Sequence, residues 1–274
     1  MSGGQRAVLI GGSGPSLQSA ELARVPASVQ VVRVNNFFLE PRYHLGRRVD
    51  CVYFSADPRA VRFYLATLRR VIARREYDVR GSASHLPEAA HFRPPEPFVH
   101  RTTWPREIEH LLDRIIADQG VRPTSGAMAM LHARAGGAAR LLLAGIDMYG
   151  SAKYSFDVPP RLAKVLSPNL NATGYDTRLH SHGADLQVIT WLLEAGVSLE
   201  RVSPEPVAGI DLPLAPVVDG EEPLSSPSTK PPRATDDWVE RDGLWTVTGL
   251  AAARAMRRHL PIRRLPAASR GDIT

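Results

Sequence analysis

Short apolar runs alternate with longer amphipathic segments over about the first 200 residues of the chain. The apolar runs predict strands at Val8–Ile10, Val29–Val34, Cys51–Phe54, Leu141–Gly145 and Val197–Val202. The segments between them predict helices at Ser16–Arg24, Pro58–Arg75, Pro105–Gln119, Ser125–Ala135 and Asp185–Glu194. Such alternation is typical of an α/β fold, a parallel sheet with helices on both faces.

Three stretches depart from this alternation. Residues 148–180 carry Gly, Ser, Pro and Asn with three tyrosines, and a loop of this length indicates a lid or binding segment. Residues 204–235 are rich in Pro and Ser and predict a linker. We therefore expect a main domain over 1–203, which includes the lid, and a basic C-terminal segment over 236–274.

Within the C-terminal extension, residues 248–265 contain five arginines and no acidic residue. Leu250, Met256 and Leu260 could give this segment an apolar side, which makes it a candidate for contact with a membrane surface. Pro261 limits the helix to about three turns. A solvated basic tail is the alternative interpretation.

Composition narrows the class of protein. Cys51 is the only cysteine among 274 residues, so an intrachain disulfide is excluded and a reducing compartment fits best. The sequence shows neither a signal peptide nor the roughly 20 apolar residues of a spanning helix. We expect a cytoplasmic protein, peripheral at the inner face of the membrane if residues 248–265 bind there.

The formal net charge is +6, and nearly all of the basic residues are arginines. These arginines are dispersed along the chain, with little aromatic interleaving and no RNA-binding motif. A GC-rich genome accounts for this bias more simply than affinity for phosphates or anionic membranes. We expect no nucleic-acid partner.

The first predicted strand ends in a glycine turn, G-G-S-G-P-S-L over residues 11–17. Glycines let a backbone turn tightly and approach a ligand. Pro15 suits a first helical turn, whose free N–H groups attract anions. The turn predicts a nucleotide or phosphate site formed by Gly12, Ser13, Gly14, Pro15 and Ser16.

A dinucleotide site is disfavoured by two features. The G-x-G-x-x-G fingerprint needs a third glycine, where this chain has Leu17. The second strand is followed by Asn35 and Asn36 instead of the acidic residue that binds the ribose of NAD. The nucleotide is therefore not expected to be NAD.

Three further clusters follow strands or begin helices, so a doubly wound sheet would bring them to the same edge. Asn35 can bind a base or a sugar hydroxyl, although a helix cap is the commoner role for such an Asn. R-P-T-S-G over residues 122–126 can cradle a carboxylate, and a plain Ser/Thr cap is the alternative. G-I-D-M-Y over residues 145–149 leads into the lid, where a tyrosine can donate to a leaving phosphate.

His180 closes the lid and is suited to proton abstraction near neutral pH, although most histidines are structural or exposed. His180 and His182 could also form a metal pair, but no third ligand stands at a convincing spacing and no D-x-D run is present. We therefore expect no metal.

In order, G-G-S-G-P-S-L, R-V-N-N-F-F-L-E-P-R-Y-H-L-G, R-P-T-S-G, L-A-G-I-D-M-Y and H-S-x-x-x-D resemble the bacterial sialyltransferases of glycosyltransferase family 42. The similarity runs from about Val8 to Val202. It implies a modified Rossmann-type fold and inverting, metal-independent transfer of sialic acid from CMP-sialic acid to a glycan hydroxyl. The donor is a substrate, and no cofactor is implied.

The resemblance also implies roles for individual residues. His180 matches the general base, and Tyr149 and Tyr154 match the pair that holds the donor phosphate. Arg122 belongs to the segment around the donor sugar. The remaining positions matched to donor binding are Gly12, Ser13, Gly14, Pro15, Ser16, Asn35, Ser55, Thr124, Ser125, Gly126, Gly145, Ile146, Asp147 and Met148.

Two of these positions depart from the family pattern. Ser13 replaces an Asn in the glycine turn, and Ser55 stands where the third strand ends in Asn-Pro. Both changes shorten a polar side chain that faces the donor. They leave open another CMP-activated nonulosonic or ulosonic acid as donor, an enzyme that mainly hydrolyses the donor, or a CMP-sugar-binding protein without transfer. The expected partners are a galactose- or sialic acid-terminated acceptor and further copies of the chain in a homo-oligomer.

Overall fold

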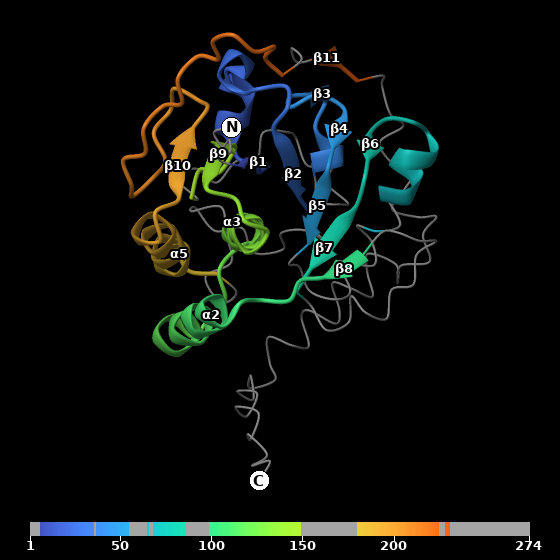
Figure 1. The fold of residues 1–274 in the computed structure, drawn as a ribbon. Helices are drawn as coiled ribbons and strands as arrows, with labels where there is room; N and C mark the ends of the chain where they lie inside the picture. Colours follow the sequence, from blue (N-terminus) through green and yellow to red (C-terminus); the bar gives the residue numbers. More distant parts are fainter. Residues whose placement is uncertain are drawn as a thin grey trace, which may run out of the picture.

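The computed structural model describes residues 6–35, 37–54, 65, 68–85, 99–148, 180–224 and 228–230. Its centre is a seven-stranded sheet in the order β10-β9-β1-β2-β5-β7-β8, and every neighbouring pair is parallel (Figure 1). The strands are β1 (Ala7–Gly11), β2 (Gln30–Val34), β5 (Cys51–Phe54), β7 (Ser82–Ser84), β8 (Val99–Arg101), β9 (Arg140–Ala144) and β10 (Ser198–Arg201). The predicted α/β class is confirmed.

The strand order places a topological switch between β1 and β9. From β1 the chain moves outward through β2, β5, β7 and β8, and it then crosses back to β9 and β10 on the other side of β1. Ala7–Gly11 pairs in register with Arg140–Ala144, so the two strands end side by side. In open α/β sheets, ligands bind beyond the carboxyl ends of strands at such a switch.

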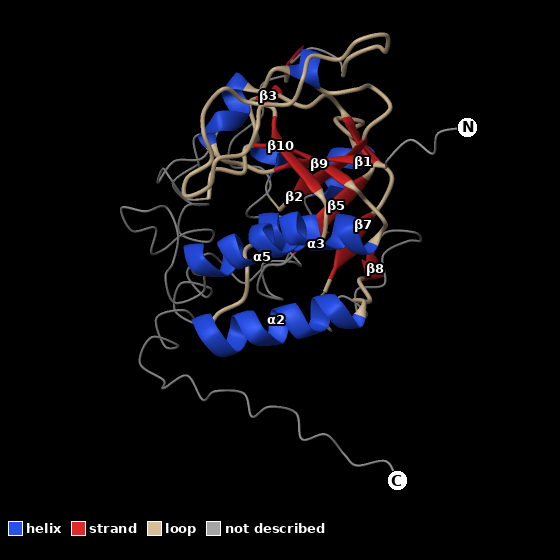
Figure 2. Cartoon of the chain, turned by 60° about the vertical axis from the view of Figure 1, so that its left-hand side comes forward, coloured by secondary structure: helices blue, strands red, loops and turns tan. Residues whose placement is uncertain are grey.

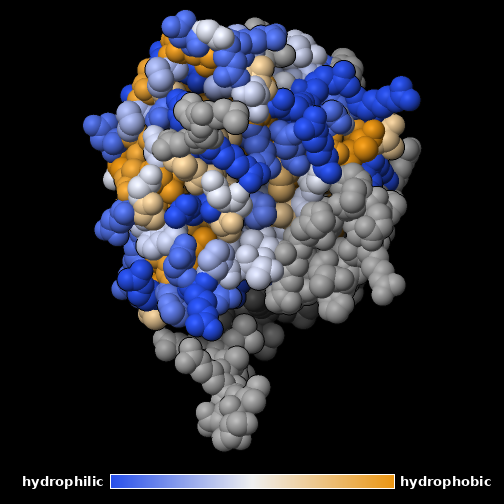
Figure 3. Space-filling model, viewed as in Figure 1, coloured by the Kyte–Doolittle hydropathy of each residue, from blue (hydrophilic) through white to orange (hydrophobic). Residues whose placement is uncertain are grey.

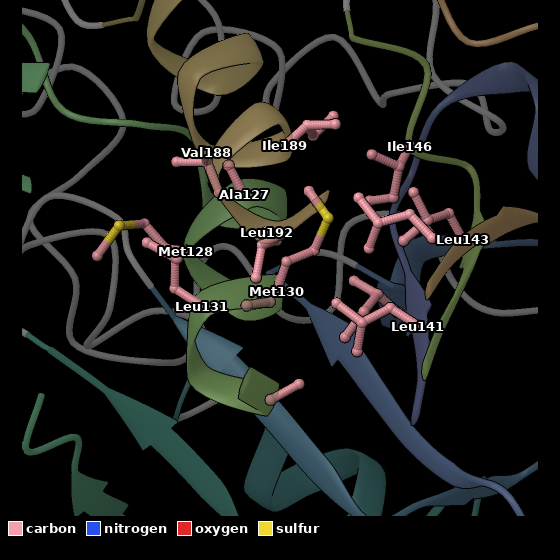
Figure 4. Packing of buried hydrophobic residues seen from close by; sticks show 14 of the residues in the cluster. Ala127, Met128, Met130, Leu131, Leu141, Leu143, Ile146, Val188, Ile189 and Leu192 are labelled. Atoms are coloured by element: carbon pink, nitrogen blue, oxygen red, sulfur yellow. The ribbon is translucent and has the colours of Figure 1, made fainter. Parts of the chain in front are cut away.

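One face of the sheet is covered by α2 (Arg106–Gln119), α3 (Ser125–Ala135) and α5 (His182–Glu194) (Figure 2). α3 lies against β1 and β2, α5 packs on α3, and α2 packs on α5. Apolar residues of α3 and α5 meet the residues of β9 in one core (Figure 4). The labelled members of this core are Ala127, Met128, Met130, Leu131, Leu141, Leu143, Ile146, Val188, Ile189 and Leu192.

The opposite face differs from the prediction near the glycine turn. A single helix over Ser16–Arg24 is predicted, and the structure has two 3-10 helices instead, η1 (Pro15–Ser19) and η2 (Leu22–Arg24). The helix is interrupted because the N–H of Glu21 donates to the carbonyl of Val202, 2.8 Å away, and not to a carbonyl one turn earlier. The prediction of one continuous helix is therefore wrong, because a tertiary hydrogen bond replaces a local one.

The described part of the predicted linker packs against the main domain. Backbone hydrogen bonds join Val218 to Ala23 at 2.8 Å and Leu224 to Val25 at 2.7 Å. Two apolar side chains of this part, Ala215 and Leu224, enter the core on the η1 side of the sheet. Residues 204–224 thus form a strap over the sheet, and they are not a free connector.

Short elements complete the described structure. They are η3 (Phe37–Leu39), β3 (Arg42–Tyr43), β4 (Arg48–Val49), β6 (Asp78–Val79) and β11 (Ser228–Thr229). β11 pairs antiparallel with β3, and β4 pairs parallel with β6. Within the helix predicted over Pro58–Arg75, the described residues 65 and 68–73 are helical.

Hydrophobic residues on the face shown in Figure 3 are scattered among hydrophilic ones. In the described ranges, the large hydrophobic residues that are exposed are Leu193 and Val217. Within the same ranges, no helix has both the length and the apolar character needed to cross a bilayer. The segment predicted to contact a membrane, residues 248–265, lies outside the described residues.

Candidate functional site

The glycine turn and the segment after β9 pack directly on each other at the switch point. The N–H of Gly12 donates to the carbonyl of Ala144 at 2.8 Å, and that of Gly14 donates to Gly145 at 2.9 Å. A Cβ atom on Gly12 would collide with the carbonyl oxygen of Gly145, and one on Gly14 would collide with the carboxylate of Asp147. These two glycines are therefore needed for the close packing of two loops.

Asp147 satisfies the donors at the start of η1. The N–H of Ser16 donates to Oδ2 of Asp147 at 3.0 Å, and the hydroxyl of Ser16 donates to Oδ1. The sequence predicts that an anion binds at this position, and in the structure the carboxylate of Asp147 occupies it. Ser16 and Asp147 thus hold the two sides of the switch point together.

Asn35 and Ser125, predicted separately as donor-binding residues, meet at this edge. Asn35 follows β2 in the left-handed region, with φ 45°, a conformation that Asn tolerates better than most residues. Its Nδ2 donates to Oγ of Ser125 at 2.7 Å. Its Oδ1 is buried and accepts no hydrogen bond from the described residues. Asn35 therefore has one acceptor atom available for a ligand.

Thr124 forms the N-terminal cap of α3, as its position before Ser125 suggests. Its Oγ1 accepts from the N–H of Ala127 at 3.5 Å. The same hydroxyl donates to Oδ2 of Asp185 at 2.6 Å, and the N–H of Thr124 donates to Oδ1 at 2.7 Å. Asp185 is only 1% exposed, and burial raises its pKa to about 6 against the opposing effect of the bonds from Thr124.

The two histidines near α5 have different surroundings. The ring Nδ1 of His182, the first residue of α5, donates to the carbonyl of Met148 at 3.0 Å. A Cβ on Gly209 would collide with the ring of His182, so this ring is also enclosed from the strap side. His180 is half-buried and stands just before Ser181, the N-cap of α5.

No group of three potential metal ligands occurs in the part of the chain that the structure describes. Within those ranges, His182 is engaged with the backbone, which gives no support to a metal pair with His180. The sequence prediction that no metal takes part stays a prediction.

A polar cluster beneath the carboxyl ends of β5 and β7 was not predicted from the sequence. The hydroxyl of Tyr53 lies 3.1 Å from Nδ1 of His85, and the rings of Tyr53 and His132 are 5.3 Å apart. Nδ1 of His132 lies 3.2 Å from the hydroxyl of Thr102. The position of His85 directly after a short strand of small residues is the only sequence signal for this cluster.

Arg122 lies near this cluster and is exposed. Burial and, to a smaller extent, the positive charge of Arg122 together lower the pKa of His85 to about 4. His85 is therefore neutral at physiological pH. The guanidinium also opposes the strong upward shift that burial gives the pKa of Tyr53.

Comparison with known proteins identifies the fold that carries this site. A family profile described as Alpha-2,3-sialyltransferase (CST-I) matches residues 6–84. The crystal structure of the monofunctional alpha-2,3-sialyltransferase Cst-I from Campylobacter jejuni matches with a TM-score of 0.74 and 20% identity, over 95% of this chain and 98% of that one. The chain has a sialyltransferase fold.

Two further sialyltransferase structures match with a TM-score of 0.67 and 23% identity. CstII from Campylobacter jejuni in complex with the substrate analogue CMP-3FNeuAc is covered over 93% of its length, and it covers 85% of this chain. CST-II in complex with a trisaccharide acceptor and CMP is covered over 93% of its length, and the match covers 84% of this chain. A comparison with curated protein sequences gave no match.

These findings confirm the resemblance to bacterial sialyltransferases that the motifs predict. They also support the prediction that the protein is an enzyme, a glycosyltransferase. The profile covers residues 11–17 and 33–46, which carry the first two motifs of the resemblance. The motifs from Arg122 onward lie beyond it.

Within the sialyltransferase fold, the structure brings together most of the predicted site residues that it describes. Gly12, Gly14, Ser16 and the segment 145–148 meet at the switch point, and Asn35 meets Ser125 beside it. Ile146 and Met148 are mostly buried, and the side chain of Ile146 packs against Gly12 and Gly126. Ser55, Tyr149 and Tyr154 lie outside the described residues, and their roles stay predictions.

Proposed function

We propose that the protein is an inverting, metal-independent sialyltransferase that transfers sialic acid from CMP-sialic acid to a glycan hydroxyl. One observation carries this proposal: the predicted donor-binding residues converge at the switch point of a sialyltransferase fold. The complexes of the similar structures support a CMP-sugar donor and a glycan acceptor, because they contain CMP-3FNeuAc in one case and a trisaccharide acceptor in another.

The donor would bind across the edge formed by β1, β2 and β9. Backbone groups of Gly145–Met148 are suited to the cytosine, and the free Oδ1 of Asn35 can accept a hydrogen bond from the donor. The first turn of α3, with Ser125 and Gly126, offers N–H groups to the carboxylate of the sugar. Arg122 supplies a positive charge near this turn.

In the transfer step, the protein must deprotonate the acceptor and stabilise the leaving phosphate. His180 takes the proton of the acceptor hydroxyl as the acceptor oxygen bonds to the anomeric carbon of sialic acid. The bond from that carbon to the phosphate oxygen breaks, and its electron pair leaves with CMP. Tyr149 and Tyr154 would donate hydrogen bonds to the departing phosphate without adding charge. Attack on the face opposite to the leaving group inverts the anomeric centre.

The test is incubation of the purified protein with CMP-Neu5Ac and a panel of galactose- and sialic acid-terminated acceptors, with and without EDTA. Mass spectrometry follows the acceptor product and free sialic acid. The proposal predicts a product that gains one sialic acid, at equal rates in both conditions. Loss of transfer in EDTA would overturn metal independence, and free sialic acid without product would show a hydrolase.

The shortened side chain of Ser13 gives one reason to include other donors in this test. A second series with other CMP-activated nonulosonic acids and with CMP-3-deoxy-manno-octulosonic acid would compare kcat/KM among donors. We propose that CMP-Neu5Ac is preferred, and a preference of tenfold or more for another donor would reassign the substrate.

A further inference from the structure

A buried carboxylate links the starts of two helices beside the proposed active site. Asp185 lies in the first turn of α5, five residues after His180, and its side chain points to α3. Both of its oxygens accept hydrogen bonds from Thr124, one from the backbone N–H at 2.7 Å and one from the hydroxyl at 2.6 Å. These bonds span 61 positions of sequence.

Thr124 connects Asp185 to the residues on the donor side of the site. It caps α3, and the next residue, Ser125, accepts the hydrogen bond from Asn35. The position of Thr124 therefore sets the position of the first turn of α3 and of the Ser125–Asn35 pair. Asp185, Thr124, Ser125 and Asn35 form a continuous series from α5 to the end of β2.

The start of α5 is held on two other sides as well. The hydroxyl of Ser181 donates to Oε1 of Gln119, at the end of α2, at 2.6 Å. The ring of His182 donates to the carbonyl of Met148 at 3.0 Å. His180 directly precedes these fixed residues. Its distance from the donor side of the site therefore depends on how α5 is attached to α3.

We propose that Asp185 is a positioning residue for sialyl transfer: it holds the His180-bearing start of α5 and the Ser125-bearing start of α3 at a fixed separation. The proposal rests on the proposed function. Asp185 contacts neither substrate nor the reacting atoms, and its effect acts through Thr124 and through the backbone that leads to His180.

The chemistry of the contact between Asp185 and Thr124 supports a role in positioning the two helices more than a role in stabilising the fold. A buried carboxylate is a costly group, and well-packed apolar residues often stabilise a core as well or better. Two bonds to adjacent donors of a single residue, however, fix both distance and orientation. Small errors of placement between a base and a bound substrate lower rates steeply.

The experiment compares Asp185→Ala with Asp185→Asn in the full chain. Asn can still accept from the N–H of Thr124, and its amide can donate to the hydroxyl, so the attachment is kept with the charge removed. We expect kcat to fall about 10- to 100-fold in Asp185→Ala and to stay within about threefold in Asp185→Asn. The dissociation constant of CMP, measured by calorimetry, should change less than threefold in both.

A matched control separates positioning from general destabilisation. Leu192 is fully buried in the last turn of α5. It lies about two helical turns from Asp185, the α5 residue that contacts Thr124. Leu192→Ala should lower the melting temperature at least as much as Asp185→Ala, with kcat within about threefold of the wild-type value below the transition. Equal losses of kcat in Leu192→Ala and Asp185→Ala would overturn the inference.

Thr124→Val tests the same contact from the other side, and if Asp185→Ala does not fold, the kcat of Thr124→Val alone is compared with that of Leu192→Ala. Thr124→Val removes the hydroxyl with little change of shape. The inference predicts that the fold-losses of Asp185→Ala and Thr124→Val do not multiply in the double variant. Independent, multiplying losses would contradict it.

Hydrogen exchange gives a readout that does not depend on transfer. In Asp185→Ala we expect faster exchange in peptides covering both 124–128 and 181–186, and in Leu192→Ala we expect no change at 124–128. Unchanged exchange at 124–128 in Asp185→Ala would overturn the inference. Absence of transfer by the wild-type protein with every donor would instead overturn the proposed function.

Discussion

The carboxylate of Asp147 accepts hydrogen bonds from both the backbone N–H and the hydroxyl of Ser16, 131 positions earlier in the chain. Asp147 follows the end of β9 and Ser16 lies in the turn after β1, so this pair joins the two loops that border the topological switch. The first turn of η1 is thereby neutralised by the chain before any donor binds.

Asp147 should therefore stabilise the fold as well as the site. Asp147→Ala leaves the N–H of Ser16 without its partner, and we expect the free energy of unfolding to fall by about 1–3 kcal/mol. Urea denaturation measures this change. Asp211→Ala, at an exposed position, is the control and should change stability by less than about 0.5 kcal/mol. Equal midpoints for the two variants would refute the role assigned to Asp147.

The close packing of the loops predicts an unequal effect of two glycine substitutions. Gly12→Ala would push a methyl group into the carbonyl of Gly145, and we expect a loss of about 1–3 kcal/mol. Gly81→Ala is the matched control, because its Cβ would lie 3.9 Å from the nearest atom, the carbonyl of Asp50. Thermal unfolding compares the two. A Gly12→Ala variant as stable as Gly81→Ala would show that the loops can separate without cost.

Asn35 allows the backbone and the side-chain contributions to be separated. Asn35→Ala removes the amide and places an alanine at positive φ, whereas Asn35→Gly removes the amide and keeps the conformation accessible. We expect the donor KM to rise about tenfold in both variants, as the loss of one or two hydrogen bonds would give. Both variants lose the bond to Ser125, and Asn35→Ala should lose more stability than Asn35→Gly because of its positive φ. Donor KM values at the wild-type level in Asn35→Gly would remove Asn35 from the donor site.

Lys230 anchors the end of the described chain in the main domain. Its Nζ donates to the carbonyl of Phe38 at 3.1 Å and lies 4.4 Å from the ring centre of Tyr77. Burial lowers the pKa of Lys230 to about 7, while the nearby Glu40 carboxylate opposes this shift. The contact fixes Lys230 next to η3, whose first residue, Phe37, is two positions after Asn35.

This pKa sets the sign of a pH dependence. Between pH 7 and the ordinary lysine value of 10.5, the unfolded chain binds more protons at this site than the folded chain does. Stability should therefore rise from pH 7 to pH 9, by at most about 2–3 kcal/mol from this group. Lys230→Met should remove the rise, as measured by urea denaturation at both pH values. An identical rise in the variant would mean that another group causes it.

Much of the fold follows from local patterns in the sequence. Cys51–Phe54 and Ser125–Ala135 are predicted with their exact bounds, because each is a mainly apolar run bordered by polar or turn-forming residues. β7 and β8 were not predicted, since Ser82–Ser84 is short and polar although it is buried. Its burial comes from the strands on either side, which local sequence does not record.

The strap and the divided helix after the glycine turn share one cause. Residues 204–224 have the Pro and Ser content of a linker, but backbone bonds to Ala23 and Val25 hold them on the sheet. The bond from Glu21 to Val202 interrupts the helix predicted there. Both depend on pairing between segments about 180 positions or more apart, which no local pattern predicts.

The candidate site, like the fold, could be predicted from the sequence only in part. The convergence of Asn35 and Ser125 follows from the parallel sheet and the rule for its carboxyl edge. The partners of Thr124 and Ser16 could not be predicted, since a Ser or Thr at a helix start shows only that its hydroxyl can bond, and not to what. Only the folded structure shows that these partners are the carboxylates of Asp185 and Asp147.

The central claim is that His180 is the base of transfer from CMP-sialic acid. The most direct measurement is the initial rate of acceptor sialylation by the wild-type protein and by His180→Ala, at saturating CMP-Neu5Ac, with CMP affinity measured for both. The account predicts one sialic acid added by the wild type and a rate at least about 100-fold lower in the variant, with CMP affinity unchanged. Transfer by His180→Ala at close to the wild-type rate would contradict it.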